Sequence, residues 1–335
     1  MKIVECGPVQ LFDREPATES FLDQVLHGLA KPEKTLPSKF FYDARGSELY
    51  EQITKLPEYY LTRTELQIVR EHAHSMAEVL GPRLRLVEFG SGSSEKTRIL
   101  LENLCDPAGY VPIDISREYL VASAARIQTE MPHLVVQPLC ADFTQPLELP
   151  PEIAPSRRTV AYFPGSTIGN LEHDAAQVFL RMVAEMVGEG GALVLGADVF
   201  PSLGTSSKPK TAEDLLLAYD DPGGVTAEFN LNLLRRMGRE LGAEIDVRAF
   251  HHEAVFNRAA GRMESYLVSD EDQQVSIGRN VFGLRAGERI LTEYSYKYGE
   301  AVSITEMAQT AGFLSGSTRR YTDAAGWFAV YLFER

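Results

Sequence analysis

The sequence predicts an α/β protein: a mostly parallel sheet of the nucleotide-binding type, its last strand antiparallel, interrupted by an inserted α+β domain. Between residues 84 and 197, short apolar segments alternate with helical ones, the pattern of a parallel sheet covered on both faces. Between residues 246 and 298, segments with a period of two replace this alternation and indicate antiparallel strands. A helix at 304–311 and strands at 315–321 and 327–334 then complete the first sheet.

Individual signals place the elements of this sheet. Thr62 and Glu65 resemble a capping box, which predicts a helix that begins there and ends near Leu80. Apolar runs bounded by turn residues predict strands, and apolar residues at helical spacing predict the helices between them. The predicted strands are 84–89, 109–115, 134–139, 159–163 and 192–197, and the predicted helices are 94–104, 117–131 and 175–187.

The remaining segments predict a second domain. Helical spacing predicts helices at 18–30 and 225–241, and the Tyr-, Pro- and Gly-rich stretch 36–63 is typical of a loop with short helical turns. The composition of 201–214 is that of a surface crossover. We therefore expect one domain of residues 64–203 and 299–335, and a second domain of residues 1–63 and 204–298.

Composition and charge exclude several classes of function. The 33 Lys and Arg residues against 47 Asp and Glu give a net charge of −14, which repels phosphate backbones, so we expect no nucleic-acid partner. No apolar run reaches the roughly 20 residues of a membrane helix, and the first residues lack a signal-peptide core. Three isolated cysteines suit a reducing compartment, and the histidines lack metal-ligand spacing. We expect a cytoplasmic protein that binds no membrane and no metal.

A glycine-rich turn, Gly90-Ser91-Gly92, follows the first predicted strand. Glycine allows the backbone to turn tightly and to approach a ligand closely. The third glycine of a dinucleotide fingerprint is absent, because Glu95 occupies its position, and the P-loop spacing is absent as well. With Glu88 before it, the turn resembles motif I of the S-adenosylmethionine-dependent methyltransferases; an ordinary tight turn is the alternative.

Polar residues also follow the next two strands. Asp114 ends the second strand, where Rossmann-like folds place a carboxylate that accepts both ribose hydroxyls. Asp142 and Phe143 follow the third strand, where such enzymes bind adenine. Asp114 alone could cap a helix and Asp142 alone could be a turn residue. Three such elements at the ends of consecutive strands together predict S-adenosylmethionine binding.

Longer segments are similar to the histidine Nα-methyltransferases of ergothioneine biosynthesis. The similar segments are 41–65, 87–98, 164–170, 218–230 and 291–298, and they include the sequences LPEYY and GSTIGN. The resemblance implies a class I methyltransferase domain with a substrate domain built from the N-terminal and inserted segments. It implies trimethylation of the α-amino group of L-histidine to hercynine, with S-adenosylmethionine as donor and S-adenosylhomocysteine as product. Our expectation for the oligomeric state is a monomer.

The resemblance also implies the residues of the site. The cofactor would be held by Tyr42, Gly90, Lys96, Asp114, Asp142 and Phe143. Histidine would be held by Tyr59, Gly165, Asn170, Tyr219, Thr226, Glu293 and Ser295, with Ser265 beside the imidazole pocket. Asn170 would orient the substrate amine, and Tyr42 or Tyr59 would relay its proton through water. Taken singly, Asn170 could instead be a left-handed turn residue, and Tyr59 could be a packing aromatic.

The chemistry of Glu293 and Ser295 supports histidine as substrate. On a strand, residues two apart face the same way, about 6.5–7 Å from each other. A carboxylate and a hydroxyl suit the ring N–H and the second ring nitrogen of an imidazole. The alternative is the polar outer face of an edge strand, which Lys297 would also fit.

Two positions depart from the family pattern and concern specificity. Ser265 stands where a larger apolar residue, often Met, is usual, and Tyr50 stands where Phe is common. A smaller residue at 265 would enlarge the pocket, so a methyltransferase acting on another amino acid, such as tryptophan, is the nearest alternative. Glu293 favours histidine over it. A non-catalytic small-molecule binding module is the more distant alternative.

Overall fold

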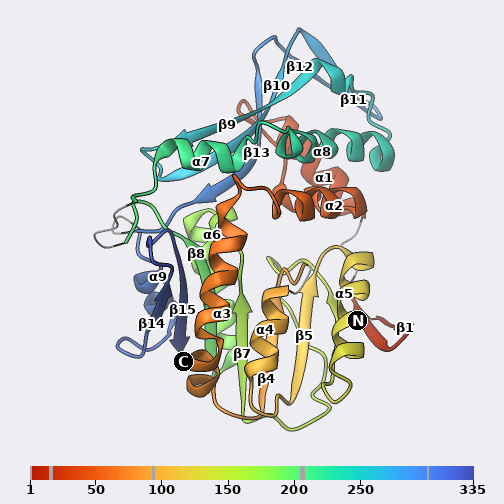
Figure 1. Ribbon diagram of the computed structural model, residues 1–335. Coiled ribbons are helices and arrows are strands. Elements are labelled where there is room, and N and C mark those ends of the chain that lie inside the picture. Colours follow the sequence, from red (N-terminus) through yellow and green to blue (C-terminus); the bar gives the residue numbers. More distant parts are fainter. Residues whose placement is uncertain (1, 15–17, 93–94, 204–207, 300–301) are drawn as a thin grey trace. The chain divides into compact units, whose positions relative to one another are not determined.

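The computed structural model describes residues 2–14, 18–92, 95–203, 208–299 and 302–335, and the chain forms two compact units (Figure 1). Unit 1 consists of Met1–Glu15, Leu61–Lys210 and Lys297–Arg335. Unit 2 consists of Pro16–Tyr60 and Thr211–Tyr296. None of the helices in these described ranges has the length and apolar character needed to cross a membrane.

In the described part of the chain, unit 1 is built on a nine-stranded sheet of order β1-β2-β6-β5-β4-β7-β8-β15-β14. Its strands are β1 (Lys2–Cys6), β2 (Val9–Asp13), β4 (Leu84–Phe89), β5 (Gly109–Asp114), β6 (Leu139–Cys140), β7 (Arg158–Phe163), β8 (Ala192–Asp198), β14 (Arg319–Thr322) and β15 (Phe328–Glu334). Neighbours from β2 to β8 are parallel, whereas β1, β15 and β14 pair antiparallel. Every residue of β4 and β8 is buried, as expected for strands covered on both faces.

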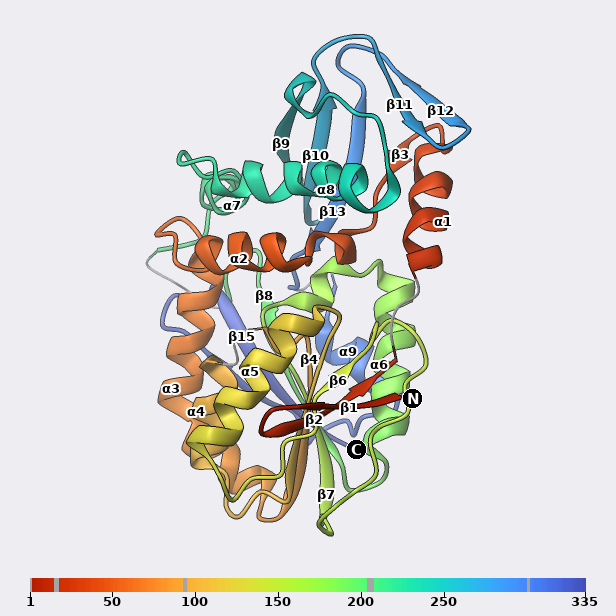
Figure 2. The same ribbon diagram turned by 90° about the vertical axis from the view of Figure 1, so that its right-hand side faces the viewer.

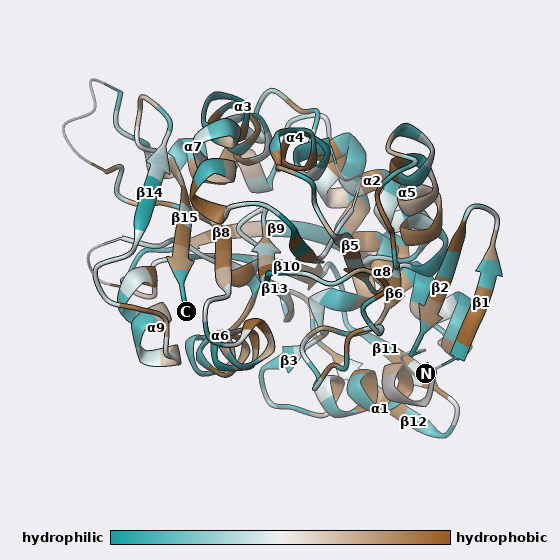
Figure 3. Ribbon diagram, turned by 90° about the horizontal axis from the view of Figure 1, so that it is seen from below, coloured by the Kyte–Doolittle hydropathy of each residue, from teal (hydrophilic) through white to brown (hydrophobic). Residues whose placement is uncertain are grey.

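Helices cover both faces of this sheet. They are α3 (Tyr60–Leu80), α4 (Glu95–Asn103), α5 (Arg117–Glu130), α6 (His173–Val187) and α9 (Ile304–Ala311). The helices α3, α4 and α5 lie on one face, and α6 and α9 lie on the other (Figures 2 and 3). The carboxyl ends of β4, β5, β6 and β7 therefore meet at one edge, where the loops that follow them gather.

Three predictions for this unit were wrong in detail. Residues 134–139 were expected to form a strand, but the regular strand β6 is only Leu139–Cys140. Val136 makes an isolated parallel bridge with Tyr110, and Pro138 between the two has no N–H for a continuous ladder. The helix α3 begins at Tyr60 and contains Thr62, so the expected capping box does not form. The N-terminal hairpin was assigned to the second domain, yet β2 pairs with β6, because Leu11 packs into the core against Leu120 and Cys140.

Unit 2 contains a four-stranded sheet of order β3-β13-β10-β9 and a two-stranded sheet of β11 and β12 in its described residues. The strands are β3 (Lys34–Thr35), β9 (Phe250–Asn257), β10 (Arg262–Ser269), β11 (Gln273–Ile277), β12 (Asn280–Leu284) and β13 (Arg289–Tyr296). The helices are α1 (Thr18–Leu29), α2 (Ala44–Ile53), α7 (Ala212–Tyr219) and α8 (Val225–Leu241). Both α7 and α8 pack on β9 and β10, and α2 packs on α8.

The helix α7 was not predicted, because its start was assigned to a surface crossover. Its signal is a capping box: the Thr211 hydroxyl accepts from the backbone N–H of Asp214, and the Asp214 carboxylate accepts from the N–H of Thr211. The N-cap and N3 positions of the sequence T-x-x-D would have located this helix. Its last residue is Tyr219, so the missed helix is the element that positions a predicted substrate residue.

Candidate functional site

The glycine-rich loop after β4 is bound to the end of β5. Gly90 and Gly92 have φ angles of 68° and 47°, in the left-handed region that favours glycine. The N–H groups of Gly90 and Ser91 donate to the carbonyl of Ile113, and the N–H of Gly92 donates to Oδ2 of Asp114 at 3.2 Å. A Cβ added to Gly90 would meet only one atom within 4 Å, on the ring of Phe143 at 3.9 Å. The loop is therefore held by hydrogen bonds to the end of β5, and the space beside the Gly90 backbone is free for a ligand to approach.

Asp114 is held by backbone donors on both carboxylate oxygens. Its Oδ1 accepts from Ser116 N at 2.9 Å, and its Oδ2 accepts from Gly92 N. A carboxylate has about four acceptor positions, so the group retains acceptor capacity beyond these backbone donors. Burial raises the pKa of Asp114 above its usual value, although the hydrogen bonds from Ser116 and Gly92 oppose this shift. The N-cap of α5 is Ser116, so the alternative of Asp114 as that cap is wrong.

The turn after β6 places an aromatic ring beside the glycine loop. Oδ1 of Asp142 accepts from the N–H and the hydroxyl of Thr144, at 3.0 and 2.6 Å, which closes the turn. The ring of Phe143 packs edge-on against Phe89, Phe163 and Phe179, with centroids 5.6 to 6.0 Å apart. An open glycine loop, a carboxylate with acceptor capacity and a fixed ring fit the ribose and adenine of S-adenosylmethionine.

Lys96 pairs with the buried carboxylate of Glu65, for which the sequence indicates only a part in a helix capping box. Its Nζ lies 2.5 Å from Oε2 of Glu65, whose side chain is fully buried on α3. The same carboxylate accepts from the N–H of Gly165, at 3.0 Å to Oε1 and 2.9 Å to Oε2. No local spacing signals this role, because the three residues meet only through the packing of α3 on the sheet.

The segment after β7 carries Gly165 and Asn170. Besides the contact of Gly165 with Glu65, hydrogen bonds hold Ser166 and Ile168 in the middle of this segment. Ser166 has a φ of 59°, and its hydroxyl accepts from the N–H of Asp198 at 2.9 Å. The Tyr298 hydroxyl donates to the carbonyl of Ile168 at 3.2 Å. Asn170 ends the short 3-10 helix Thr167–Asn170. Ser166, rather than Asn170, takes the left-handed conformation, so the turn-residue alternative for Asn170 is wrong.

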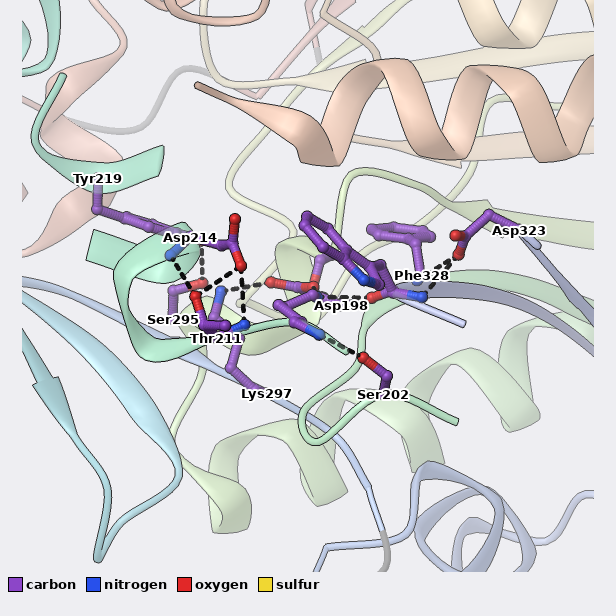
Figure 4. A network of polar contacts seen from close by, with 12 residues as sticks. Asp198, Ser202, Thr211, Asp214, Tyr219, Ser295, Lys297, Asp323 and Phe328 are labelled. Atoms are coloured by element: carbon purple, nitrogen blue, oxygen red, sulfur yellow. Dashed lines mark hydrogen bonds and ion pairs between the residues drawn. The ribbon is translucent and has the colours of Figure 1, made fainter. Parts of the chain in front are cut away.

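Asp198 ends β8 and is bound by two buried lysines (Figure 4). Lys297 Nζ lies 2.8 Å from Oδ2, and Lys210 Nζ contacts Oδ1 and donates to the carbonyl of Trp327 at 2.7 Å. Burial lowers the pKa of Lys210 to about 8. Burial alone would raise the pKa of Asp198, but the two ammonium groups outweigh it and lower that pKa. Lys297 is therefore a buried ion-pair partner, so the alternative that placed it on an exposed strand face is wrong.

In unit 2, tyrosine side chains collect around the end of α7. The hydroxyls of Tyr219 and Ser295 lie 2.6 Å apart (Figure 4). Ring contacts continue from Tyr219 to Tyr59 at 6.3 Å, from Tyr59 to Tyr50 at 6.5 Å, and from Tyr50 to Tyr42 at 5.6 Å between centroids. Burial and the neighbouring tyrosines raise the pKa of Tyr59 well above its usual value, so it remains a neutral phenol. Four residues of the predicted site thus lie in one cluster together with Tyr50, namely Tyr42, Tyr59, Tyr219 and Ser295.

Glu293 and Ser265 are direct neighbours across β13 and β10. They are register partners, as are Ser295 and Met263, and the register shifts immediately after Ser265. Partners in an antiparallel pair share a face, so these side chains lie on the side of the sheet where Ser295 meets α7. Ser295 and Ser265 are buried, and β13 lies between β3 and β10. The alternative of an exposed edge-strand face is therefore wrong.

His252 supports Tyr219, a role the sequence did not indicate. Its Nδ1 lies 2.8 Å from the amide nitrogen of Asn230, which donates, so the other ring nitrogen donates to the carbonyl of Tyr219 at 2.8 Å. Burial lowers the pKa of His252, which favours this neutral form. Thr226 lies in the first turn of α8, where its N–H donates to Asp221 at 2.7 Å. One turn later, Phe229 packs against the tyrosine cluster.

The predicted residues thus form two sets. Unit 1 holds Gly90, Lys96, Asp114, Asp142, Phe143, Gly165 and Asn170, and unit 2 holds Tyr42, Tyr59, Tyr219, Thr226, Ser265, Glu293 and Ser295. Among the described residues, no group of three or more His, Cys, Asp or Glu side chains is arranged to hold a metal ion.

Comparison with known proteins decides between methyltransferases and other users of this fold. Residues 21–335 match the model of a family described as histidine-specific methyltransferase, SAM-dependent. The chain belongs to this family. The match confirms the predicted class I methyltransferase fold and the dependence on S-adenosylmethionine that the loop after β4 indicated.

Relatives of this family include proteins of known activity. The chain is 42% identical over 313 residues to the histidine N-alpha-methyltransferase of Mycobacterium tuberculosis, covering 92% of each chain. It is 38% identical over 323 residues to the corresponding protein of Mycolicibacterium smegmatis, covering 95% and 96%. It is 28% identical over 330 residues to a 4-dimethylallyltryptophan N-methyltransferase of Aspergillus fumigatus, covering 94% and 92%.

Proposed function

We propose that this protein trimethylates the α-amino group of L-histidine to hercynine, the first step of ergothioneine biosynthesis. The observation that carries the proposal is the face of β13 and β10 on which Glu293 adjoins Ser265, and on which Ser295 meets Tyr219. It offers one acidic acceptor, Glu293, and the adaptable hydroxyls of Ser295 and Tyr219, the groups that suit an imidazole. Family membership and the two mycobacterial relatives support the same substrate.

Different residues of the proposed cofactor set would bind different parts of S-adenosylmethionine. Asp114 would accept the ribose hydroxyls, and Asp142 with Phe143 would bind adenine, while the open backbone at Gly90 permits close approach. Lys96 and Tyr42 complete the set implied by the family. When bound, S-adenosylmethionine supplies a methyl group that its sulfonium charge already activates. The protein's contribution is therefore orientation rather than activation of the donor.

The substrate residues would orient histidine at both of its ends. Glu293 would accept the ring N–H, with Ser295 and Tyr219 as partners of the second ring nitrogen. Asn170 offers an amide that accepts from the amine and donates to the carboxylate, and the backbone at Gly165 would lie against the substrate. The remaining residues of this set, Tyr59 and Thr226, would line the site.

The substrate ammonium must lose a proton before it can attack. Tyr59 is a neutral phenol, because burial raises its pKa well above the usual value, so it cannot accept this proton outright. Tyr59 or Tyr42 would instead relay the proton through water. Isolated cysteines and the acidic composition support a cytoplasmic site of action, and we further propose a monomer, which light scattering of the purified protein checks.

A tryptophan-type substrate is the second candidate. The small side chain of Ser265 beside Glu293 favours it, because a larger ring needs room at that position. The experiment that separates the two is mass spectrometry of products after incubation of each of the twenty amino acids with S-adenosylmethionine. We expect trimethylated histidine as the dominant product. Equal methylation of tryptophan overturns the histidine assignment and leaves the methyltransferase assignment in place.

A further inference from the structure

The carboxylate of Glu65 connects two segments that the proposed function uses for different ligands. Its Oε2 lies 2.5 Å from Nζ of Lys96, a residue of the proposed cofactor set. Both of its oxygens accept from the N–H of Gly165, which begins the segment that carries Asn170. All four residues belong to unit 1, so these contacts lie within one compact body.

The strand β8 leaves room for this carboxylate. Gly196 lies in a fully buried strand whose other residues before Asp198 are apolar. A Cβ at this position would lie 2.0 Å from Oε1 of Glu65, much closer than any non-bonded contact allows. Glycine inside a strand marks a close approach of another group, and here that group is the carboxylate of α3. The position of the Glu65 carboxylate on α3 therefore requires glycine at residue 196 of β8.

Because Glu65 is buried, its carboxylate depends on its two protein partners rather than on water. A carboxylate without partners in this environment would be strongly unfavourable, and the ammonium of Lys96 and the N–H of Gly165 offset that cost. A buried ion pair adds little net stability compared with apolar packing, but it constrains the geometry of its members. Lys96 is about one-fifth exposed, at 19%, whereas Glu65 is 0% exposed, so the pair reaches from the core toward the surface.

We propose that Glu65 is a positioning residue for methyl transfer, which holds the Lys96 ammonium for the cofactor and the Gly165–Asn170 segment for the amino acid. The proposal rests on the proposed function, because Lys96 and Asn170 report its two effects. In this role Glu65 acts through the two donors that it binds, Lys96 and Gly165, rather than through a contact of its own with either ligand.

The cofactor effect is tested by a double-mutant cycle read by calorimetry with S-adenosylhomocysteine. Glu65→Gln keeps the size of the side chain and an oxygen for Gly165, but removes the charge that holds Lys96. We expect about tenfold weaker binding in Glu65→Gln and in Lys96→Met, and no further loss beyond about twofold in the double variant. Additive losses, tighter binding, or unchanged affinity in Glu65→Gln overturn this part of the proposal.

The effect on the Gly165–Asn170 segment is tested by kinetics with histidine. Gly196→Ala directs a methyl group at Oε1 of Glu65, and the carboxylate must swing away from Gly165 to make room. We expect the KM for histidine to rise about fivefold or more in Gly196→Ala and in Glu65→Ala, and to change less than about twofold in Glu65→Gln, which retains the acceptor. Equal KM values in all variants overturn it.

A matched control separates positioning from general stability. Glu288→Gln removes a partly buried ion pair with Lys34, 2.7 Å long, in unit 2. It should lower the unfolding temperature without changing the affinity for S-adenosylhomocysteine or the KM for histidine. Calorimetry needs no turnover, so a wild-type protein that fails to methylate histidine overturns the proposed function while the Glu65–Lys96 cycle still decides the first part of this proposal.

Discussion

The hydroxyl oxygens of Tyr219 and Ser295 lie 2.6 Å apart, and both side chains are buried. The contact joins the last residue of α7 to β13 within unit 2. The backbone carbonyl of Tyr219 is held in turn by His252. Because either hydroxyl can donate or accept, the pair can match either tautomer of a neutral imidazole.

Removing one hydroxyl of this pair should weaken histidine binding more than turnover. In Tyr219→Phe the ring contacts remain and one neutral hydrogen bond is lost, which costs about 1 kcal/mol, or roughly five- to tenfold in KM. Steady-state kinetics with histidine checks this. Tyr294→Phe, on the opposite face of the same strand, is the matched control and should leave KM unchanged. A larger fall in kcat than in kcat/KM would contradict a binding role.

Asp114→Ala should weaken S-adenosylmethionine binding by about 2–3 kcal/mol, because one carboxylate would otherwise satisfy two ribose hydroxyls. Burial raises the pKa of Asp114, so protonation removes this acceptor at a pH above the ordinary 3.8. Wild-type affinity should therefore fall as the pH falls through that raised value, and the variant should lack this dependence. Calorimetry across the acidic range checks both, with circular dichroism to verify folding. Unchanged affinity in a folded variant rejects the site.

Asn170→Ala should abolish turnover and leave cofactor affinity nearly intact. The residue ends the 3-10 helix after β7, and Tyr298 and Asp198 hold that segment independently of the Asn170 side chain. The loss should therefore be one of substrate orientation, which decides the rate when the donor is already activated. Single-turnover kinetics together with calorimetry checks the split. A variant with wild-type kcat and KM would mean that Asn170 has only a structural role.

Glu293→Ala should lower kcat/KM for histidine by about 1.5–3 kcal/mol, roughly 10- to 150-fold, because a charged hydrogen bond is lost in a partly buried site. Tryptophan should lose less. Ser265→Met, at the register partner of Glu293, should act in the opposite direction by filling space beside the ring. Competition between histidine and tryptophan in one reaction measures both. If Glu293→Ala leaves histidine turnover untouched, the histidine assignment fails.

Glu88 should make stability depend on pH. Burial raises its pKa from 4.5 to about 8, despite hydrogen bonds from Thr97 and Tyr110. Between these values the folded state binds more protons than the unfolded state, so stability falls as the pH rises, by up to about 1.4 kcal/mol per unit. Glu88→Gln should keep both hydroxyl contacts and remove this slope. Urea unfolding at several pH values from 5 to 9 measures it, and an unchanged slope would contradict the assignment.

Much of the fold follows from local sequence. The helix at 304–311 and the helix at 225–241 have the bounds that their periodicity predicts, and the strand at 84–89 does too. Each has a repeating apolar pattern and a clear terminus, and both are properties of neighbouring residues. The open turn at Gly90 was likewise predictable, because a positive φ is a property that glycine supplies locally.

The tertiary structure alone decided what the buried charges do. Glu65 has helical neighbours, but its partners Lys96 and Gly165 arrive from two other segments, and Gly196 makes room for it from a third. Lys297 reads as an exposed strand residue until the end of β8 places Asp198 against it. Sequence spacing predicts periodic burial and turn chemistry, since those depend on adjacent residues. A buried ion pair depends on which distant segments pack together, because only there does the loss of water make each charge require its partner.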